Sequence, residues 1–233
     1  MREFTVFGAS HFVALFVVAG VGLGMAWLRD PWRRRAERLL AVLLFLIWPL
    51  RVLGALRVGT LALDDALPLH YCDIAAICGG VALWTRGHDG CCEIVYFFGL
   101  AGTLQGLITP PLQVDWPHPR FFYHFLWHGG VVMTAIYVVT AMHHAPRAGA
   151  VWRMMGRTLL YALIVGGLNA LLHTNYGFLC EKPPSPSLMD SLGSWPWYVG
   201  SLGLVALVFY TLLDLPFMVR RRRAVIGHAS QRP

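Results

Sequence analysis

The sequence is divided into a series of apolar segments, each about long enough to cross a lipid bilayer. A spanning α-helix needs about 20 consecutive, mostly apolar residues. Seven segments come near that length, at residues 8–28, 39–58, 67–85, 92–109, 120–142, 155–174 and 195–218. The intervals between them are too short for a separate soluble domain. We therefore expect a single integral membrane domain over residues 1–233, an all-α, polytopic bundle of seven transmembrane helices with a basic tail at 219–233.

The composition agrees with a membrane protein and argues against a nucleic-acid partner. Hydrophobic residues make up 57% of the chain and charged residues only 13%, whereas soluble domains carry about 25% charged residues. The net charge of +7 comes largely from arginines in 29–38 and 220–223, which flank apolar segments. Arginines in that position set topology and contact anionic lipid head groups. We expect a multi-pass protein of the cell membrane whose partners are membrane lipids, with anionic head groups at the arginine clusters.

The distribution of arginines also predicts the orientation of the chain. The first, third and fifth loops and the C-terminal tail are basic, whereas the second, fourth and sixth loops are acidic or nearly free of basic residues. Basic loops stay in the cytoplasm. The N-terminus is therefore predicted outside and the C-terminus in the cytoplasm, a parity that seven spans satisfy.

Polar side chains recur at one depth of this predicted bundle. A rise of about 1.5 Å per residue places polar residues from six segments in the outer third of the bilayer, whereas Asp214 lies near the inner end. Ionisable residues inside a membrane usually face the bundle interior or a wet cavity. The sequence thus predicts a polar cavity near the outer leaflet, formed by His11, Arg51, His70, Cys72, Asp73, Gln105, His124, His128, Asn169 and His173.

One chemistry that fits these residues is nucleophilic catalysis by Cys72, with His124 or His128 as the base and Asp73 as an orienting group. Helical spacing puts His124 and His128 on one face, and Asn169 and His173 on another. Asn169 or Gln105 could donate a hydrogen bond to an oxyanion. This arrangement suits acyl transfer to, or hydrolysis of, a lipid ester or amide. The simpler alternative is that Cys72 packs as a small apolar residue.

Two other interpretations remain open. His124 and His128 have a metal-ligand spacing, and His173, His11, His70 or Asp73 could complete a zinc site in a metal-dependent membrane hydrolase. Hydrogen bonding between helices explains the same spacing without a metal, so we assign no cofactor and no metal ligand.

The other interpretation is a non-enzymatic protein that binds or transports a lipid or small molecule. Arg51 either pairs with Asp73 or holds a phosphate or carboxylate. His11, His70, Gln105, Asn169 and His173 are further candidates for substrate binding. The polar residues do not continue into the inner leaflet, which favours a closed outer cavity over a transport pathway.

Several motifs along the chain resemble the YwaF family of bacterial integral membrane proteins. They are "FGASHF" near the N-terminus, "WPLR" around Arg51, "LPLHYCDIAA" at 67–76, "FYHFLWHGG" around His124, and "GGLNALLHTNYGFL" around Asn169. That family is similar to the animal transmembrane protein 164 family, described as membrane acyltransferases that remodel ether phospholipids through a cysteine. The resemblance implies that Cys72 matches this cysteine. Asp73 stands where the animal proteins carry a histidine.

Overall fold

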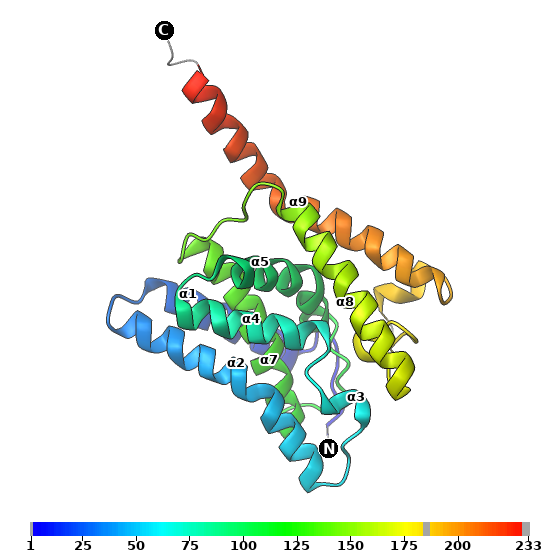
Figure 1. The fold of residues 1–233 in the computed structure, drawn as a ribbon. Coiled ribbons are helices and arrows are strands. Elements are labelled where there is room, and N and C mark those ends of the chain that lie inside the picture. The colour runs from blue at the N-terminus through cyan, green and yellow to red at the C-terminus, as the bar shows by residue number, and fades with distance from the viewer. Residues whose placement is uncertain (1, 184–186, 230–233) are drawn as a thin grey trace.

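The chain folds into helices joined by short loops, as the computed structural model shows for residues 2–183 and 187–229 (Figure 1). A π-helical turn, Gly99–Thr103, joins α5 to α6, so these helices form one continuous rod. The α-helices are α1 (Ala9–Trp27), α2 (Trp32–Arg57), α3 (Leu63–Ala66), α4 (Tyr71–Thr85), α5 (Asp89–Phe98), α6 (Leu104–Ile108), α7 (Pro119–Thr140), α8 (Ala150–Leu172) and α9 (Trp197–Ala229).

Six of the described helical rods are long and apolar enough to cross a membrane, which makes this a multi-pass membrane protein. They are α1, α2, the α5–α6 rod, α7, α8 and α9. The predicted third span, 67–85, yields only the 15 residues of α4. That helix is about 22 Å long, short of a hydrocarbon core of about 30 Å, because residues 67–70 are not helical. Seven full spans are therefore not supported, and the orientation stays a prediction.

The interior of the bundle is formed by α4, α5 and α7. Helix α4 packs against α2, α5 and α7, and α1 also packs against α7. Glycines permit close approaches between helices: a Cβ on Gly79 would lie 3.1 Å from Val95, and one on Gly99 would lie 2.9 Å from Ala135. Small residues have this role at many helix contacts in membranes. Among the spanning rods, α7 is the most buried, and α1 and α9 are the least.

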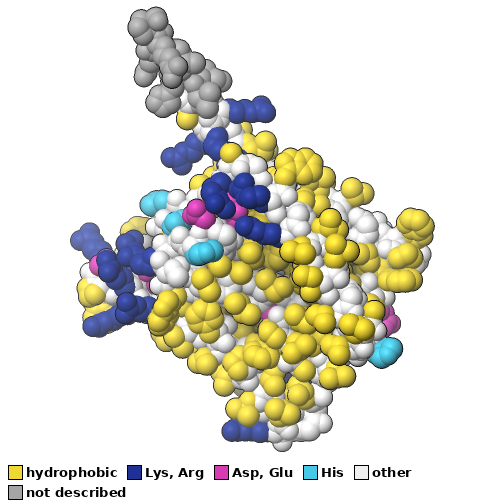
Figure 2. All heavy atoms as spheres, in the orientation of Figure 1, with side chains coloured by type: hydrophobic (Ala, Val, Ile, Leu, Met, Phe, Trp, Pro, Cys, Tyr) yellow, Lys and Arg dark blue, Asp and Glu magenta, His cyan; other side chains and the backbone are white. Residues whose placement is uncertain are grey.

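The two ends of the bundle differ in charge. We call one the arginine end; it comprises the α1–α2, α4–α5 and α7–α8 connections and the last turns of α9. The opposite end, which contains the start of α4, is called the Cys72 end. Helices α8 and α9 lie at one side, and α9 projects beyond the rest of the molecule at the arginine end (Figure 1). Hydrophobic side chains cover most of the face seen in Figure 2, and basic side chains gather mainly at its upper and left margins. A hydrophobic face of this kind suits contact with lipid.

Candidate functional site at the Cys72 end

Cys72 is the second residue of α4, and its position at a helix start defines its surroundings. His70 precedes the helix with an extended backbone, and its N–H donates to Asp73 Oδ2 at 3.1 Å, which fixes the first turn. Cys72 is half-buried, and its burial disfavours the charged thiolate. Unpaired N–H groups at a helix start carry partial positive charge, and this contribution acts in the opposite direction by favouring a thiolate.

Arg51 and Asp73 form an ion pair beside this cysteine. Arg51 Nη2, from α2, lies 3.9 Å from Asp73 Oδ2, and the Asp73 side chain is only 1% exposed. The guanidinium also sits over the ring of Trp127 from α7, 5.3 Å from its centroid. The pair predicted from depth is therefore present, and it connects α2, α4 and α7. Asp73 follows Cys72 and Trp127 precedes His128 in the sequence, so Arg51 lies near both residues.

His124 and His128 stack on one face of α7, with ring centroids 4.1 Å apart. His124 Nε2 donates to the carbonyl oxygen of Gly106 at 2.9 Å. His128 Nδ1 donates to the carbonyl oxygen of His124 at 3.1 Å. A neutral imidazole has one donor and one acceptor nitrogen, so Nε2 of neutral His128 keeps a lone pair. A Cβ on Gly106 would lie 3.0 Å from the His128 ring, and the glycine gives the imidazole its space.

Two further histidines predicted at this end, His11 and His70, have both ring nitrogens engaged in internal hydrogen bonds. Fully buried His11 accepts from the N–H of Phe7 at 2.9 Å and donates to the carbonyl of Leu107 at 3.0 Å. His70 donates to the carbonyl of Asp64 at 3.0 Å and accepts from the N–H of Gly177 at 3.3 Å. These bonds attach chain segments to one another, which explains both histidines without a ligand.

Asn169 and His173 are separated by the end of α8. Asn169 is buried; its Oδ1 accepts from the Tyr176 N–H at 2.9 Å and from Thr174 at 3.0 Å, and its Nδ2 donates to the Tyr176 carbonyl. His173 follows the last helical residue, in the left-handed conformation with φ of 52°, and is exposed. The expectation that both share a helical face is wrong, because the helix ends between them. Gln105 is half-buried in α6.

Three hydroxyl groups form a triangle that was not predicted, and one of them belongs to Tyr71, which precedes Cys72 in the sequence. The hydroxyls of Tyr71, Thr158 and Tyr210 are each 2.9 Å from the other two, and so they join α4, α8 and α9. The ring of Tyr71 also stacks on Phe98 at 3.9 Å between centroids. Threonine and tyrosine occur in apolar segments without marking a site, so the sequence offers no signal for this cluster.

The arginine end contains two buried carboxylates that the sequence analysis missed. Glu37 is 1% exposed and pairs with Arg86 at 3.2 Å, and the Tyr137 hydroxyl donates to it at 2.8 Å. Asp214 was the one polar residue expected inside a helix near this end. Glu37 also lies there, because α2 begins at Trp32 and not at residue 39. Glu93, which is 4% exposed, is a second buried carboxylate at this end that the sequence did not predict.

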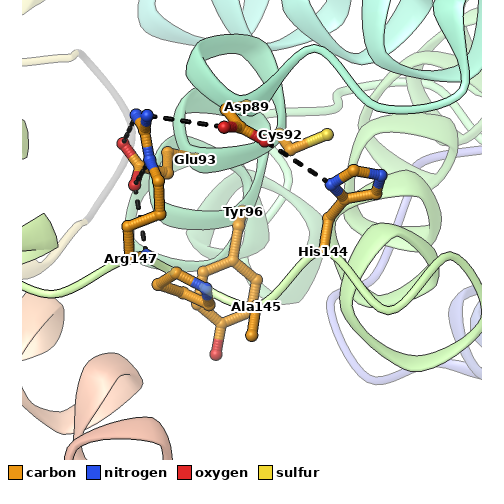
Figure 3. Close-up of a pocket in the computed structure, with 8 residues that line it drawn as sticks. Asp89, Cys92, Glu93, Tyr96, His144, Ala145 and Arg147 are labelled. Carbon is orange, nitrogen blue, oxygen red and sulfur yellow. Dashed lines mark hydrogen bonds and ion pairs between the residues drawn. The ribbon is translucent and has the colours of Figure 1, made fainter.

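Three arginines surround Glu93. Its carboxylate binds Arg147 at 3.1 Å, Arg153 at 2.6 Å and Arg157 at 3.2 Å. Figure 3 shows Arg147 extended between Glu93 and Asp89, with His144 on the other side of Asp89. The bonds to Glu93 raise the pKa of Arg147 above its ordinary value. The pocket that these residues line has a volume of about 10 Å³, which holds one water molecule at most. This cluster therefore stabilises the α5–α8 contact and is too small for a substrate.

The described residues include no group of three or more histidine, cysteine or acidic side chains placed to hold a metal ion. His124 and His128 stack through their ring faces, and His11 and His70 bond elsewhere. Nothing in this geometry supports a zinc site.

Comparison with known proteins gives one match. The family model described as the TMEM164 family matches residues 6–214, which include all helices from α1 to α8 and most of α9's apolar part. No curated protein and no solved structure shows significant similarity to the chain.

Proposed function

The chain belongs to the TMEM164 family of membrane proteins, and we propose that it is an enzyme that transfers or hydrolyses the acyl group of a membrane lipid, with Cys72 as nucleophile. The narrower resemblance to the bacterial YwaF proteins is part of this proposal. So is the acyltransferase activity described for the animal proteins, which enters only as the class of reaction. The substrate class is a lipid ester or amide.

The observation that supports this proposal best is the placement of Cys72 at a helix start beside a cation. Cys72 is the second residue of α4, where backbone N–H groups lack helical partners. The next residue, Asp73, pairs with Arg51, which brings a positive charge to the same helical turn. Reactive cysteines occur in such electropositive, partly accessible environments, whereas purely structural cysteines are inert. Cys78, on the same helix, lies well inside α4 and therefore has no unpaired backbone N–H groups of a helix start beside it.

The reaction requires a base, and His128 is the best candidate. In the proposed step, His128 Nε2 accepts the thiol proton, directly or through one water molecule. The Cys72 sulfur then attacks the acyl carbonyl carbon, the bond to the lipid oxygen or nitrogen breaks, and the leaving group takes the proton. The product is a thioester on Cys72. A hydroxyl group of an acceptor lipid, or water, attacks this thioester in the second step and releases the thiol.

Arg51 is the candidate for binding the negative charge that develops. A guanidinium carries several donors in one plane and binds phosphate or carboxylate oxygens well. Its pairing with Asp73 holds it next to the start of α4. Asp73 is therefore a positioning residue, and it takes no part in the bond changes.

The test is detection of the acyl-enzyme in proteoliposomes that contain a phospholipid with an alkyne-tagged acyl chain. Wild type should become labelled, and hydroxylamine should remove the label because it cleaves thioesters. Cys72→Ala should abolish labelling, whereas Cys78→Ala, a second half-buried cysteine of α4, should keep it.

Equal lipid turnover by wild type and Cys72→Ala would reject the proposed nucleophile. If the Cys72→Ala protein still bound the tagged lipid stoichiometrically and wild type released no lyso-lipid, the binding-protein interpretation would replace the enzyme.

A further inference from the structure

A groove at the arginine end lies far from Cys72 and is much larger than the pocket beside Glu93. It runs between the start of α8 and the part of α9 near Asp214, and its volume is about 580 Å³. That volume is in the usual range of ligand sites, about 300–1,000 Å³. Its walls include Val151 and Trp152 from α8, and Met218, Arg221 and Arg222 from α9. We propose that this groove binds an anionic phospholipid of the adjacent leaflet.

The charges around the groove favour an anionic ligand. Arg221 is already engaged: it binds both oxygens of Asp214 at 2.8 and 2.9 Å and donates to the carbonyl of Pro146 at 2.7 Å. Arg222 also lines the groove and is exposed, and it has no ion pair with any carboxylate of the described residues. The phosphate of a lipid head group would supply that partner.

The ion pairs around the groove leave an excess of positive charge. The Glu93 cluster and the groove together contain five arginines but only three carboxylates, Asp89, Glu93 and Asp214. Figure 2 shows basic and acidic side chains together at the upper margin of the hydrophobic face. The first turn of α8 adds to the positive potential, since it has no acidic residue and no side-chain cap.

The apolar wall argues for a lipid over a soluble anion. Trp152 is 73% exposed at the start of α8, and its neighbours in the groove include Val151 and Met218. Tryptophan is enriched where the hydrocarbon meets the head groups. A free phosphate would contact the arginine and leave this wall exposed, whereas a phospholipid covers both, with its phosphate at Arg222 and its acyl chains along α8 and α9.

The test is retention of phosphatidylglycerol by the purified full chain, measured by native mass spectrometry after exchange into detergent with defined lipid. A basic residue near the membrane surface contributes about 1 kcal/mol to binding of anionic lipid, so Arg222→Gln should lower the affinity about fivefold. Trp152→Ala should also lower it. Arg223→Gln is the matched control, because Arg223 is also exposed but does not line the groove. Phosphatidylcholine retention should not change in Arg222→Gln or Arg223→Gln.

Three outcomes would overturn the proposal. Equal losses in Arg222→Gln and Arg223→Gln would show diffuse attraction to a basic helix. No loss in Arg222→Gln would reject the site. Displacement of phosphatidylglycerol by soluble glycerol 3-phosphate at similar concentration would show a site for a free anion. Unchanged melting temperatures in detergent establish that the variants fold. Cys72→Ala should keep wild-type retention, so failure here is separate from failure of the catalytic proposal.

Discussion

Substitutions in the Arg51–Asp73 pair should affect the stability of the protein and the reactivity of the Cys72 thiol differently. Two unit charges 3.9 Å apart attract by about 4 kcal/mol at an effective dielectric constant of about 20. Desolvation offsets part of this attraction, since Asp73 is 1% exposed and Arg51 is 16% exposed. We therefore expect a coupling energy of about 2 kcal/mol in a double-mutant cycle of Arg51→Gln and Asp73→Asn. Each single variant should melt about 4–8 °C below wild type.

The same two substitutions should change the reactivity of Cys72 in opposite directions. A positive neighbour favours the reactive thiolate and a negative neighbour opposes it. Alkylation by iodoacetamide should therefore be fastest in Asp73→Asn, slower in wild type and slowest in Arg51→Gln. A difference of about 1.4 kcal/mol in thiolate stability corresponds to about tenfold in rate.

The assay follows each cysteine separately by mass spectrometry of its peptide. Exposed Cys180 is the internal reference, because its alkylation reports the reagent and not the bundle. The reasoning is refuted if the coupling energy is below about 0.5 kcal/mol, the usual limit of additivity. It is also refuted if both single variants change the ratio of Cys72 to Cys180 alkylation in the same direction, since loss of packing alone would do that.

Further predictions concern the packing of the bundle. Glu93→Gln should lower the free energy of unfolding by about 3 kcal/mol, because three arginines lose a buried partner. Asp89 is 57% exposed, so Asp89→Asn should lower it by less than about 1 kcal/mol. Thermal unfolding in detergent compares the two variants, and equal losses would contradict this prediction. Gly106→Ala should displace His128, 3.0 Å from the new Cβ, and reduce acyl-enzyme formation more than stability; unchanged labelling would count against His128 as base. Thr158→Val should destabilise by about 1 kcal/mol, because it removes one hydroxyl of the triangle, and an unchanged melting temperature would show that this hydroxyl adds nothing.

Depth along the predicted spans was sufficient to anticipate some contacts. Arg51 and Asp73 are adjacent because a helical rise of fixed size places both near the same level. The same reasoning anticipated that His124 and His128 share a face, since i and i+4 side chains always do. These predictions rest on local helical geometry, which hydropathy and spacing determine without knowledge of the packing.

Other features depend on where each helix starts and ends, which hydropathy does not mark. Glu37 is inside α2 because the helix extends beyond the apolar run to Trp32, and there it finds Arg86 and Tyr137. Helix α4 is short because the chain from Leu67 to His70 is not helical. Similarly, the partners of Asn169 come from residues just beyond the end of α8. In each case a loop or a helix terminus, set by tertiary contacts, decided the role of a polar side chain.

The histidines at the Cys72 end differ in how many of their ring nitrogens form hydrogen bonds. His11 and His70 each use one nitrogen as donor and the other as acceptor, so protonation would cost each of them an internal bond. His128 donates through Nδ1 alone, so its Nε2 can accept a proton without loss of any bond that the described residues make. A base in a catalytic cycle must gain and release a proton repeatedly while its position stays fixed. His128 meets that requirement, as does His124, which donates through Nε2 alone. The carbonyl of His124 also fixes the ring of His128 in place.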